Sequence, residues 1–354
     1  MKRMGSAAAL AAAVSVSAAA AAEPLKVGFV YLGPISDHGW TYQHEQGRLA
    51  VEAHFGAAVE TTYVENVADG ADSERVIRNL AAGGYDIVFA TSFGYMNGAL
   101  AVAEAYPGVV IEHATGYKRA ANMGTYMAAS HEGRYVAGFV AGHVTETGLV
   151  GYIASFPIPE VIRDINAVML GLQASNPDAR LQVIWLNTWF DPGKEREAAD
   201  ALIAQGVDVL MQHTDSAAPM QAAEEAGVHA IGYASDMSQF GPHAHLLSVI
   251  NNWAPFYVDV VQDVMDGTWQ SQDFWGGISD DVVAVRGLNE ALPADVRAEA
   301  EAIVASMADD SFHPFTGPLY DQRGAERVAA GHVMSDAELA AMDWFVRGIE
   351  QPLP

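Results

Sequence analysis

The chain contains no cysteine and has few basic residues. Among its 354 residues there are 18 Lys and Arg against 44 Asp and Glu, a formal net charge of −26. The absence of cysteine excludes disulfide bonds, thiolate metal ligands and a cysteine nucleophile. A surface this acidic repels phosphate backbones and anionic lipid head groups, so nucleic acid and membrane lipid are poor candidate partners.

Long apolar runs are also missing. No stretch approaches the ~20 large apolar residues of a membrane helix. Residues 1–22 instead begin with Lys2 and Arg3, continue as an Ala-rich stretch and end in three alanines. This pattern is typical of a cleaved secretory signal, although an Ala-rich helix of the mature fold is the alternative. We expect cleavage after Ala22 and, without a cysteine to carry lipid, a soluble periplasmic protein that has no membrane anchor.

Enzyme motifs are scarce. The sequence has no Gly-x-Ser-x-Gly elbow and no glycine-rich dinucleotide or phosphate loop. His243 and His245 have a spacing found in some metal sites, but no third ligand is evident nearby, so neither a metal nor another cofactor is expected. Glu132, Asp215 and Asp236 could act as acid and base in a hydrolase, which is the main enzymatic alternative.

From Lys26 onward, short apolar runs alternate with helical stretches. This alternation predicts an α/β protein whose parallel sheets are covered by helices. The strands are expected at 26–31, 59–65, 86–92, 109–114 and 124–128, then at 149–154, 181–186, 207–212 and 229–234. The helices between them are expected at 41–54, 72–82, 96–105, 159–174, 192–205 and 217–225.

Each series of strands has the size of one doubly wound domain, so we expect two lobes. The chain after residue 248 supplies a further strand, a helix and an extended piece, which we expect to pass back to the first lobe and return. Lobe one is predicted to comprise 23–127 and 249–275, and lobe two 128–248 and 276–354. Several crossing strands would then form a hinge that permits closure.

The end of the chain is predicted to be helical. A multi-turn helix is expected at about 293–307, followed by a terminal helix over 335–348. Ser335 and Glu338 have the spacing of a capping box at the start of that last helix.

Aromatic and acidic side chains collect after the predicted strands. Ligands of open parallel sheets bind beyond the carboxyl ends of the strands, and loops there usually carry small polar residues. The unusual residues at these positions are Asp37, Trp40, Phe93, Trp189, Phe190, Asp215 and Asp236. Two facing lobes would therefore enclose a cleft with aromatic faces and an acidic rim.

Such a cleft favours a nitrogen heterocycle. A flat ring gains ~1–3 kcal/mol from each stacked aromatic face, and carboxylates accept hydrogen bonds from ring N–H groups and exocyclic amines. Sugars also stack on Trp and remain the alternative ligand class. A purely structural role is open too: Asp191 before Pro192 is typical of a helix N-cap, and Asp37, Asp215 and Asp236 can equally cap local turns.

Several motifs together resemble one family. They are Lys26-Val-Gly-Phe-Val-Tyr with Ser36-Asp-His-Gly-Trp-Thr, Ala90-Thr-Ser-Phe-Gly-Tyr, His131-Glu-Gly-Arg-Tyr-Val-Ala-Gly and Trp189-Phe-Asp-Pro-Gly-Lys. The sequence resembles the basic membrane protein (BMP, or PnrA-like) family of ABC-transporter solute-binding proteins from about Leu25 to Tyr320. The resemblance implies a type I periplasmic-binding fold, an ABC-transporter permease as partner, and a purine nucleoside or free adenine as ligand. We expect a monomer.

The resemblance also implies roles for individual residues. The two stacking aromatics of the family fall on Trp40 and Trp189, and its polar contacts fall near His131 and Glu132 in one segment and near Asp215 and Asp236 in another. The full set of expected ligand-binding residues is Asp37, Trp40, Thr41, Phe93, His131, Glu132, Trp189, Phe190, Asp215, Asp236 and Asn251.

Two departures bear on the ligand. Nucleoside-binding members carry an Asn where this chain has Thr41, and a ribose-contacting Lys where it reads Asn251-Asn252. Without that Lys, and with the bulkier Trp at both stacking positions, we expect a free purine base, adenine first, rather than a nucleoside. A sensor that binds a purine and couples to a membrane receptor has the same sequence signature and stays open.

Overall fold

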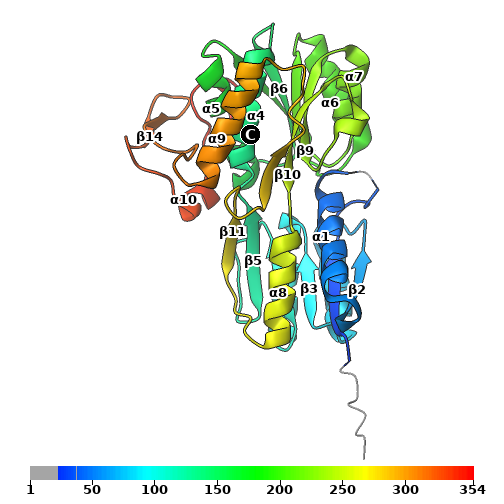
Figure 1. Cartoon of the computed structure of the whole chain (residues 1–354). Coiled ribbons are helices and arrows are strands. Elements are labelled where there is room, and N and C mark those ends of the chain that lie inside the picture. Colours follow the sequence, from blue (N-terminus) through cyan, green and yellow to red (C-terminus); the bar gives the residue numbers. More distant parts are fainter. Residues whose placement is uncertain (1–22, 37) are drawn as a thin grey trace, which may run out of the picture.

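The computed structural model describes residues 23–36 and 38–354. The predicted signal segment 1–22 and Asp37 lie outside the described residues. Two six-stranded sheets lie end to end, each flanked by helices (Figure 1). The α/β fold expected from the alternating pattern is confirmed, and most strands lie within two or three residues of their predicted positions.

The sheet of lobe one is entirely parallel, in the order β11-β5-β4-β3-β1-β2. Its strands are β1 (Leu25–Val30), β2 (Val59–Val64), β3 (Ile87–Ala90), β4 (Val110–Ala114), β5 (Met123–Ala128) and β11 (Asp273–Gly276). Successive side chains face opposite sides, so Phe29 packs in the core beneath α1 and α8 while Val30 packs beneath α2 and α3. Both faces are covered, which explains the nearly continuous apolar runs.

The sheet of lobe two has the order β12-β10-β9-β8-β6-β7 and is parallel except for β12. Its strands are β6 (Leu149–Ala154), β7 (Arg180–Trp185), β8 (Val209–His213), β9 (His229–Ala234), β10 (His245–Asn251) and β12 (Val283–Arg286). In both sheets the strand order reverses next to the first strand of the lobe, which is where doubly wound folds bind ligands.

The helices pack in pairs on the sheets. In lobe one α1 packs against α8 and α2 against α3, while in lobe two α4 packs against α5 and α6 against α7. Their bounds are α1 (Gly39–Phe55), α2 (Ala71–Ala82), α3 (Met96–Ala105), α4 (His131–Val144), α5 (Pro159–Ser175), α6 (Pro192–Ala204), α7 (Ala218–Ala226), α8 (Ala254–Asp266) and α9 (Ala294–Ala308).

The chain passes between the two sheets three times, from β5 to α4, from β10 to α8 and from β11 to β12. Strand β10 stays hydrogen-bonded in the second sheet through Asn251, where it pairs with Val283. The crossing expected near residue 249 therefore lies slightly later in the chain. Three connections side by side can bend together, which is the arrangement that hinge closure requires.

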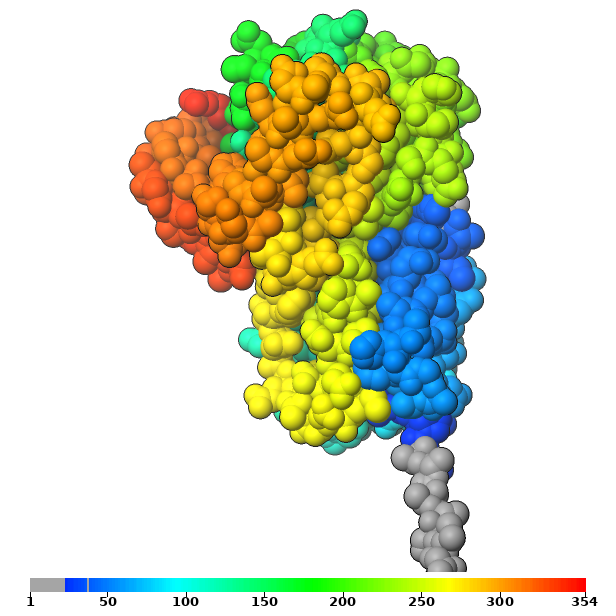
Figure 2. Space-filling model, in the orientation of Figure 1, coloured from blue at the N-terminus to red at the C-terminus, as the bar shows by residue number. Residues whose placement is uncertain are grey.

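The last segment, residues 309–354, forms a small irregular body beside lobe two (Figure 2). It contains β13 (Leu319–Tyr320), β14 (Glu326–Val328) and α10 (Asp336–Ala340). The capping box of Ser335 and Glu338 is confirmed, but the predicted helix 335–348 is wrong in length because α10 ends at Ala340.

Tertiary contacts explain the early end of α10. The side chain of Asn166 on α5 donates to the Trp344 carbonyl (2.8 Å) and accepts from the Val346 amide (2.9 Å). A bridge between Leu181 and Ile349 then extends the edge of the second sheet. These bonds hold the chain extended, and aromatic and β-branched residues lose little by leaving a helix.

The contact between α4 and α5 depends on glycine. A Cβ on Gly171 would lie 2.0 Å from the carbonyl oxygen of Tyr135 in the facing helix. Gly171→Ala should therefore lower the free energy of unfolding by roughly 1–3 kcal/mol, because overpacking outweighs the better helix propensity of Ala. Chemical denaturation measures this. Gly108→Ala is the control, since no atom lies within 4 Å of a Cβ there. Equal stability of the two variants would contradict the packing argument.

Candidate functional site

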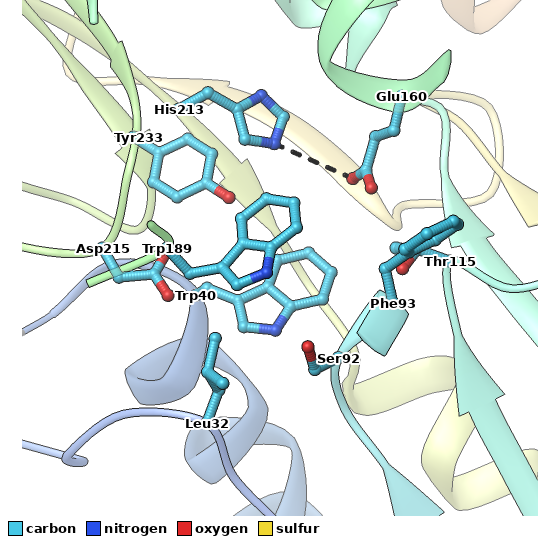
Figure 3. Close-up of a pocket in the computed structure, with 10 residues that line it drawn as sticks. All are labelled: Leu32, Trp40, Ser92, Phe93, Thr115, Glu160, Trp189, His213, Asp215 and Tyr233. Carbon is cyan, nitrogen blue, oxygen red and sulfur yellow. Dashed lines mark ion pairs between the residues drawn. The ribbon is translucent and has the colours of Figure 1, made fainter. Parts of the chain in front are cut away.

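A pocket lies between the lobes, at the carboxyl ends of strands from both sheets. It encloses about 280 Å³ and is shown in Figure 3. The residues that line it are Leu32, Trp40, Ser92, Phe93, Thr115, Glu160, Trp189, His213, Asp215 and Tyr233. The first five come from lobe one and the others from lobe two, so the pocket is complete only while the lobes are closed.

Trp40 is the second residue of α1 and is held firmly. Its indole N–H donates to the Thr91 carbonyl at the end of β3 (2.6 Å), and 7% of the residue is exposed. The ring also packs edge-on against Trp253 (5.6 Å between centroids) and His44 (4.5 Å). The hydrogen bond satisfies the only polar atom of the side chain, which leaves the ring free to present apolar surface to the pocket.

Trp189 lies on the loop between β7 and α6 of the opposite lobe. Its carbonyl accepts from the Asp215 amide (2.9 Å), and its ring packs at an angle against Phe156 (5.1 Å). The loop ends where Asp191 accepts from the Lys194 amide (3.1 Å), so the predicted N-cap of α6 is confirmed. Both indoles point into the pocket in Figure 3, and among the described residues no ring contact joins Trp40 to Trp189.

Asp215 is one of the two carboxyl side chains in the pocket lining, with Glu160. It is 3% exposed, and its Oδ1 atom has no hydrogen-bond partner among the described residues. Burial, reinforced by the nearby Glu195 and Glu160 carboxyls, raises the pKa of Asp215 well above its ordinary value. A protonated carboxyl can both donate and accept a hydrogen bond, whereas a carboxylate only accepts.

Glu160 and His213 form a second polar pair, with 4.0 Å between His213 Nε2 and Glu160 Oε1 (Figure 3). Burial raises the pKa of Glu160 to about 8, and burial together with Arg134 and Arg163 lowers the pKa of His213 well below 6.5. At neutral pH both groups are therefore mainly uncharged. The pocket offers donors and acceptors without a net charge from this pair.

A buried ion pair supports the pocket from behind. Arg134 Nε lies 3.4 Å from Asp164 Oδ2, and the Ser130 hydroxyl donates to the same carboxylate (2.9 Å). The Arg134 guanidinium also lies over the ring of Tyr233, 5.1 Å from its centroid. These contacts fix the position of Tyr233, whose side chain faces the pocket in Figure 3.

Three strands end in a left-handed residue near the pocket. Thr115 after β4, Asn187 after β7 and Ala234 at the end of β9 have φ values of 63°, 54° and 56°. Non-glycine residues adopt this conformation at a cost, and it concentrates at binding sites. The turn at Asn187 leads into the loop that carries Trp189, and the turn at Ala234 leads into the loop that carries Ser235.

The described state is closed. The Gly39 amide at the start of α1 donates to the Ser235 hydroxyl in lobe two (2.7 Å), and the Gln239 amide group donates to His38 Nε2 (2.5 Å). A Cβ on Gly39 would lie 3.0 Å from the Asp215 carbonyl oxygen, and φ at Gly39 is +73°. Glycine therefore meets both a steric and a conformational requirement at this contact.

Of the eleven residues expected to bind ligand, four line the pocket: Trp40, Phe93, Trp189 and Asp215. Three others lie near it but outside its lining. The Thr41 hydroxyl accepts from the Gly33 amide (3.1 Å), Phe190 packs near Gly33, and the exposed Asp236 accepts from the Ser238 amide (2.9 Å). The last contact is the turn cap that was the structural alternative for Asp236.

Three expected residues lie at the crossings between lobes instead. Glu132 accepts from the Ile278 amide (2.6 Å), and buried Asn251 ends β10. His131 is buried beside His313 and Phe315, with 5.6 Å between ring centroids in each case. None of these three lines the pocket, because His131 faces the C-terminal segment, Glu132 the connection between β11 and β12, and Asn251 ends the strand before a crossing.

Sequence reasoning missed Glu160, His213 and Tyr233. The rule that ligands bind after strand ends applied to β6 as well, and Glu160 lies in the segment that follows it. His213 is the last residue of β8 and lies two residues before Asp215, which was expected to bind ligand. Tyr233 carried no signal, because a tyrosine inside an apolar strand is normally a core residue.

The histidine pair expected not to bind metal has separate partners. His243 Nδ1 lies 2.5 Å from Glu224 Oε1, whereas His245 Nε2 lies 2.8 Å from the Ser248 hydroxyl. Within the part of the chain that the structure describes, no group of three or more His, Cys, Asp or Glu side chains is arranged to hold a metal ion.

Two sheet lobes, three crossings and a pocket between facing strand ends define a two-lobed solute-binding protein. The chain belongs to the family of PnrA-like ABC transporter substrate-binding proteins, whose model matches residues 25–307. It is 48% identical to a purine-binding protein of Brucella abortus, over 95% of this chain and 96% of that one. It is also 40% identical to a protein of Haloferax volcanii named as an ABC transporter glucose-binding protein, over 94% and 82% of the two chains.

Solved structures agree with the fold. An ABC transporter solute-binding protein of Aeropyrum pernix matches with a TM-score of 0.71 at 16% identity, over 82% of this chain and 93% of that one.

The family and the relatives are solute-binding proteins and not enzymes, which sets aside the hydrolase alternative. Proteins of this family work outside the cytoplasm. Within residues 23–36 and 38–354, no helix is long and apolar enough to cross a bilayer.

The raised pKa of Glu160 links stability to pH. The folded protein keeps a proton on Glu160 until about pH 8, whereas the unfolded chain releases it near 4.5. The free energy of unfolding should therefore fall as pH rises between these values. Glu160→Gln should reduce that fall, measured by denaturation at pH 5 and pH 8 without ligand. The exposed Glu299→Gln is the control. An unchanged pH dependence in Glu160→Gln would contradict the assignment.

Proposed function

We propose that this protein captures a free purine base in the pocket between its lobes and delivers it to the membrane permease of an ABC importer. The observation that carries the proposal is that Trp40 and Trp189, from opposite lobes, line one pocket together with the buried Asp215. The 48% identical Brucella protein is purine-binding and supports the same ligand class.

The stacking argument follows from the two indoles. A planar ring between two aromatic faces needs a separation of ~7 Å, twice the ~3.5 Å contact distance of carbon atoms. Each face contributes ~1–3 kcal/mol. Since one indole comes from each lobe, the second face is gained only on closure, and the ligand stabilises the closed form through that difference.

Edge recognition favours adenine. Adenine presents a ring-nitrogen acceptor beside an exocyclic amine donor. Burial raises the pKa of Asp215, and in its protonated form this carboxyl supplies the matching donor and acceptor. Its Oδ1 atom has no hydrogen-bond partner within the described residues. A wrong edge would leave a buried polar atom unpaired at a cost of ~1–3 kcal/mol. Sugars lack this pattern, although a Trp-lined pocket suits them as well.

The free base is proposed over the nucleoside because the chain lacks the ribose-contacting Lys of nucleoside-binding members. The corresponding residues are Asn251 and Asn252. Of these, Asn251 is buried at a crossing and Asn252 donates to the Asp281 carbonyl (2.9 Å). Neither lines the pocket.

The transport role is proposed as capture by closure. The open lobes expose the two indoles, the base stacks on one, and hinge rotation at the three crossings brings the other over it. We propose that the exported protein starts at Glu23 after signal cleavage and acts as a periplasmic monomer. A sensor that passes the closed shape to a membrane receptor would use the same pocket.

Calorimetry with adenine, guanine, hypoxanthine, adenosine and glucose tests the ligand class. We expect adenine to bind most tightly and adenosine more weakly, because the pocket recognises the base edge and lacks the ribose contact. An adenosine affinity well above that of adenine would overturn the preference for the free base. Tight binding of glucose with no purine binding would overturn the purine proposal as a whole.

Substitution of either indole tests the stacking. Trp40→Ala and Trp189→Ala should each weaken adenine binding by ~1–3 kcal/mol, since each removes one stacked face. Trp40→Phe and Trp189→Phe retain a ring and should lose less. Isothermal titration gives the dissociation constants, and thermal unfolding checks that the variants fold. Unchanged dissociation constants in both alanine variants would refute the sandwich.

A further inference from the structure

A second chamber adjoins the pocket on the side of the crossings. It encloses about 480 Å³ and shares Phe93, Thr115 and Glu160 with the first pocket. The residues found only in its lining include Arg163 of α5, Trp275 of β11 and Ala340 of α10. A ligand whose ring lies in the pocket can therefore extend a substituent past Glu160 into this chamber.

Arg163 is the unusual residue of the chamber. It is 0% exposed, and its guanidinium lies 4.8 Å from the centroid of the Trp275 ring. Nη1 donates to the Leu339 carbonyl (3.3 Å), whereas Nε and Nη2 have no hydrogen-bond partner in residues 23–36 and 38–354. Among the described residues, no carboxylate lies within the 4.0 Å of an ion pair with Arg163, unlike Arg134, which pairs with Asp164.

The two unpartnered nitrogens have a shared geometry. Nε and Nη2 lie on the same edge of the planar guanidinium, the edge whose parallel N–H groups match the two oxygens of a carboxylate. A buried donor left without a partner is destabilising, and more so when it is charged. A ligand carboxylate would satisfy both donors at once.

The other charged groups of the chamber favour a ligand group that carries a single negative charge. The exposed Asp273 lines the chamber, and Asp336 at the start of α10 interacts electrostatically with both Asp273 and Arg163. These carboxylates oppose a doubly charged phosphate more strongly than a monovalent carboxylate. Ribose hydroxyls would give Arg163 neither charge nor two fixed acceptor oxygens.

We propose that the second chamber is a subsite for a carboxylate carried on a substituent of the purine ring, bound by the Nε–Nη2 edge of Arg163. The subsite rests on the proposed function, because it places the ring between Trp40 and Trp189. It extends the ligand class from free bases to purines that bear one carboxylate arm. Trp275 and the Leu339 carbonyl hold the guanidinium in place for this contact.

Isothermal titration of the full mature protein tests the subsite with matched probes. These are adenine, N6-(carboxymethyl)adenine, 9-(carboxymethyl)adenine and the neutral carboxamide of each. One of the two acids should bind roughly ten- to hundred-fold more tightly than its own carboxamide, because a charged hydrogen bond is worth ~1.5–3 kcal/mol. Two positions are used because either edge of the ring can face the chamber.

Variants assign the effect to Arg163. In Arg163→Met the ratio between acid and carboxamide should fall toward one, and in Arg163→Lys it should be intermediate, since Lys keeps the charge but loses the paired donors. The exposed Arg286→Met is the matched control and should keep the wild-type ratio. Thermal unfolding identifies a variant that fails to fold, and the comparison of wild-type acid and carboxamide stands without any variant.

The outcomes separate the two proposals. Adenine binding with no advantage for either acid overturns the subsite and leaves the purine function intact. An acid advantage that survives Arg163→Met overturns the role of Arg163. Adenosine monophosphate is titrated as well. If it bound more tightly than either acid, and if this advantage were lost in Arg163→Met, the chamber would be a phosphate subsite and the carboxylate proposal would be overturned. Failure of every purine to bind overturns the proposed function itself.

Discussion

The contact between the first turn of α1 and the loops of lobe two holds the pocket together. Gly39 approaches the Asp215 backbone to a distance that excludes a side chain, and its amide donates to Ser235. The next residue is Trp40, so this contact between the lobes is adjacent in sequence to one of the two indoles that line the pocket. Closure and the completion of the pocket are therefore one event.

Buried polar groups set the chemistry of that pocket. Glu160, Asp164, Asp215 and Arg134 all lie in the closed interior, where an ionised group without a partner is expensive. Arg134 and Asp164 neutralise each other, while burial keeps Glu160 mainly protonated at neutral pH and raises the pKa of Asp215 well above its ordinary value. The interior thus offers hydrogen-bond donors and acceptors with little net charge, although the whole chain is strongly acidic. This contrast favours a neutral heterocycle over a charged metabolite at the first pocket.

The C-terminal segment packs against the helix that leads into the pocket. The family match ends at residue 307, and residues 309–354 pack beyond it on α5. Through Asn166 and Arg163 the segment contacts the same helix that carries Glu160 into the pocket. The segment therefore packs behind the site, and its residue Ala340 lines the second chamber.

The sequence alone determined the α/β class, most strands and helices, and the edge of each sheet on which the site lies, whereas α4 and the short strands β12, β13 and β14 were not expected. Period-two and period-3.6 patterns are local, and the strand-end rule needs only the order of the elements, which is why Trp40, Phe93, Trp189 and Asp215 could be named. The capping box of Ser335 also depends on neighbouring residues alone and could be predicted. The length of α10 could not, because hydrogen bonds from the distant Asn166 hold the following residues in an extended conformation.

Only the tertiary structure decided which of the remaining polar residues meet. His131 and Glu132 follow a strand of lobe one but begin a helix of lobe two, so a crossing of the chain carries them away from the pocket. Glu160, Tyr233 and the free edge of Arg163 became visible only when both lobes were in place. Burial and pairing depend on residues distant in sequence, and no local pattern encodes them.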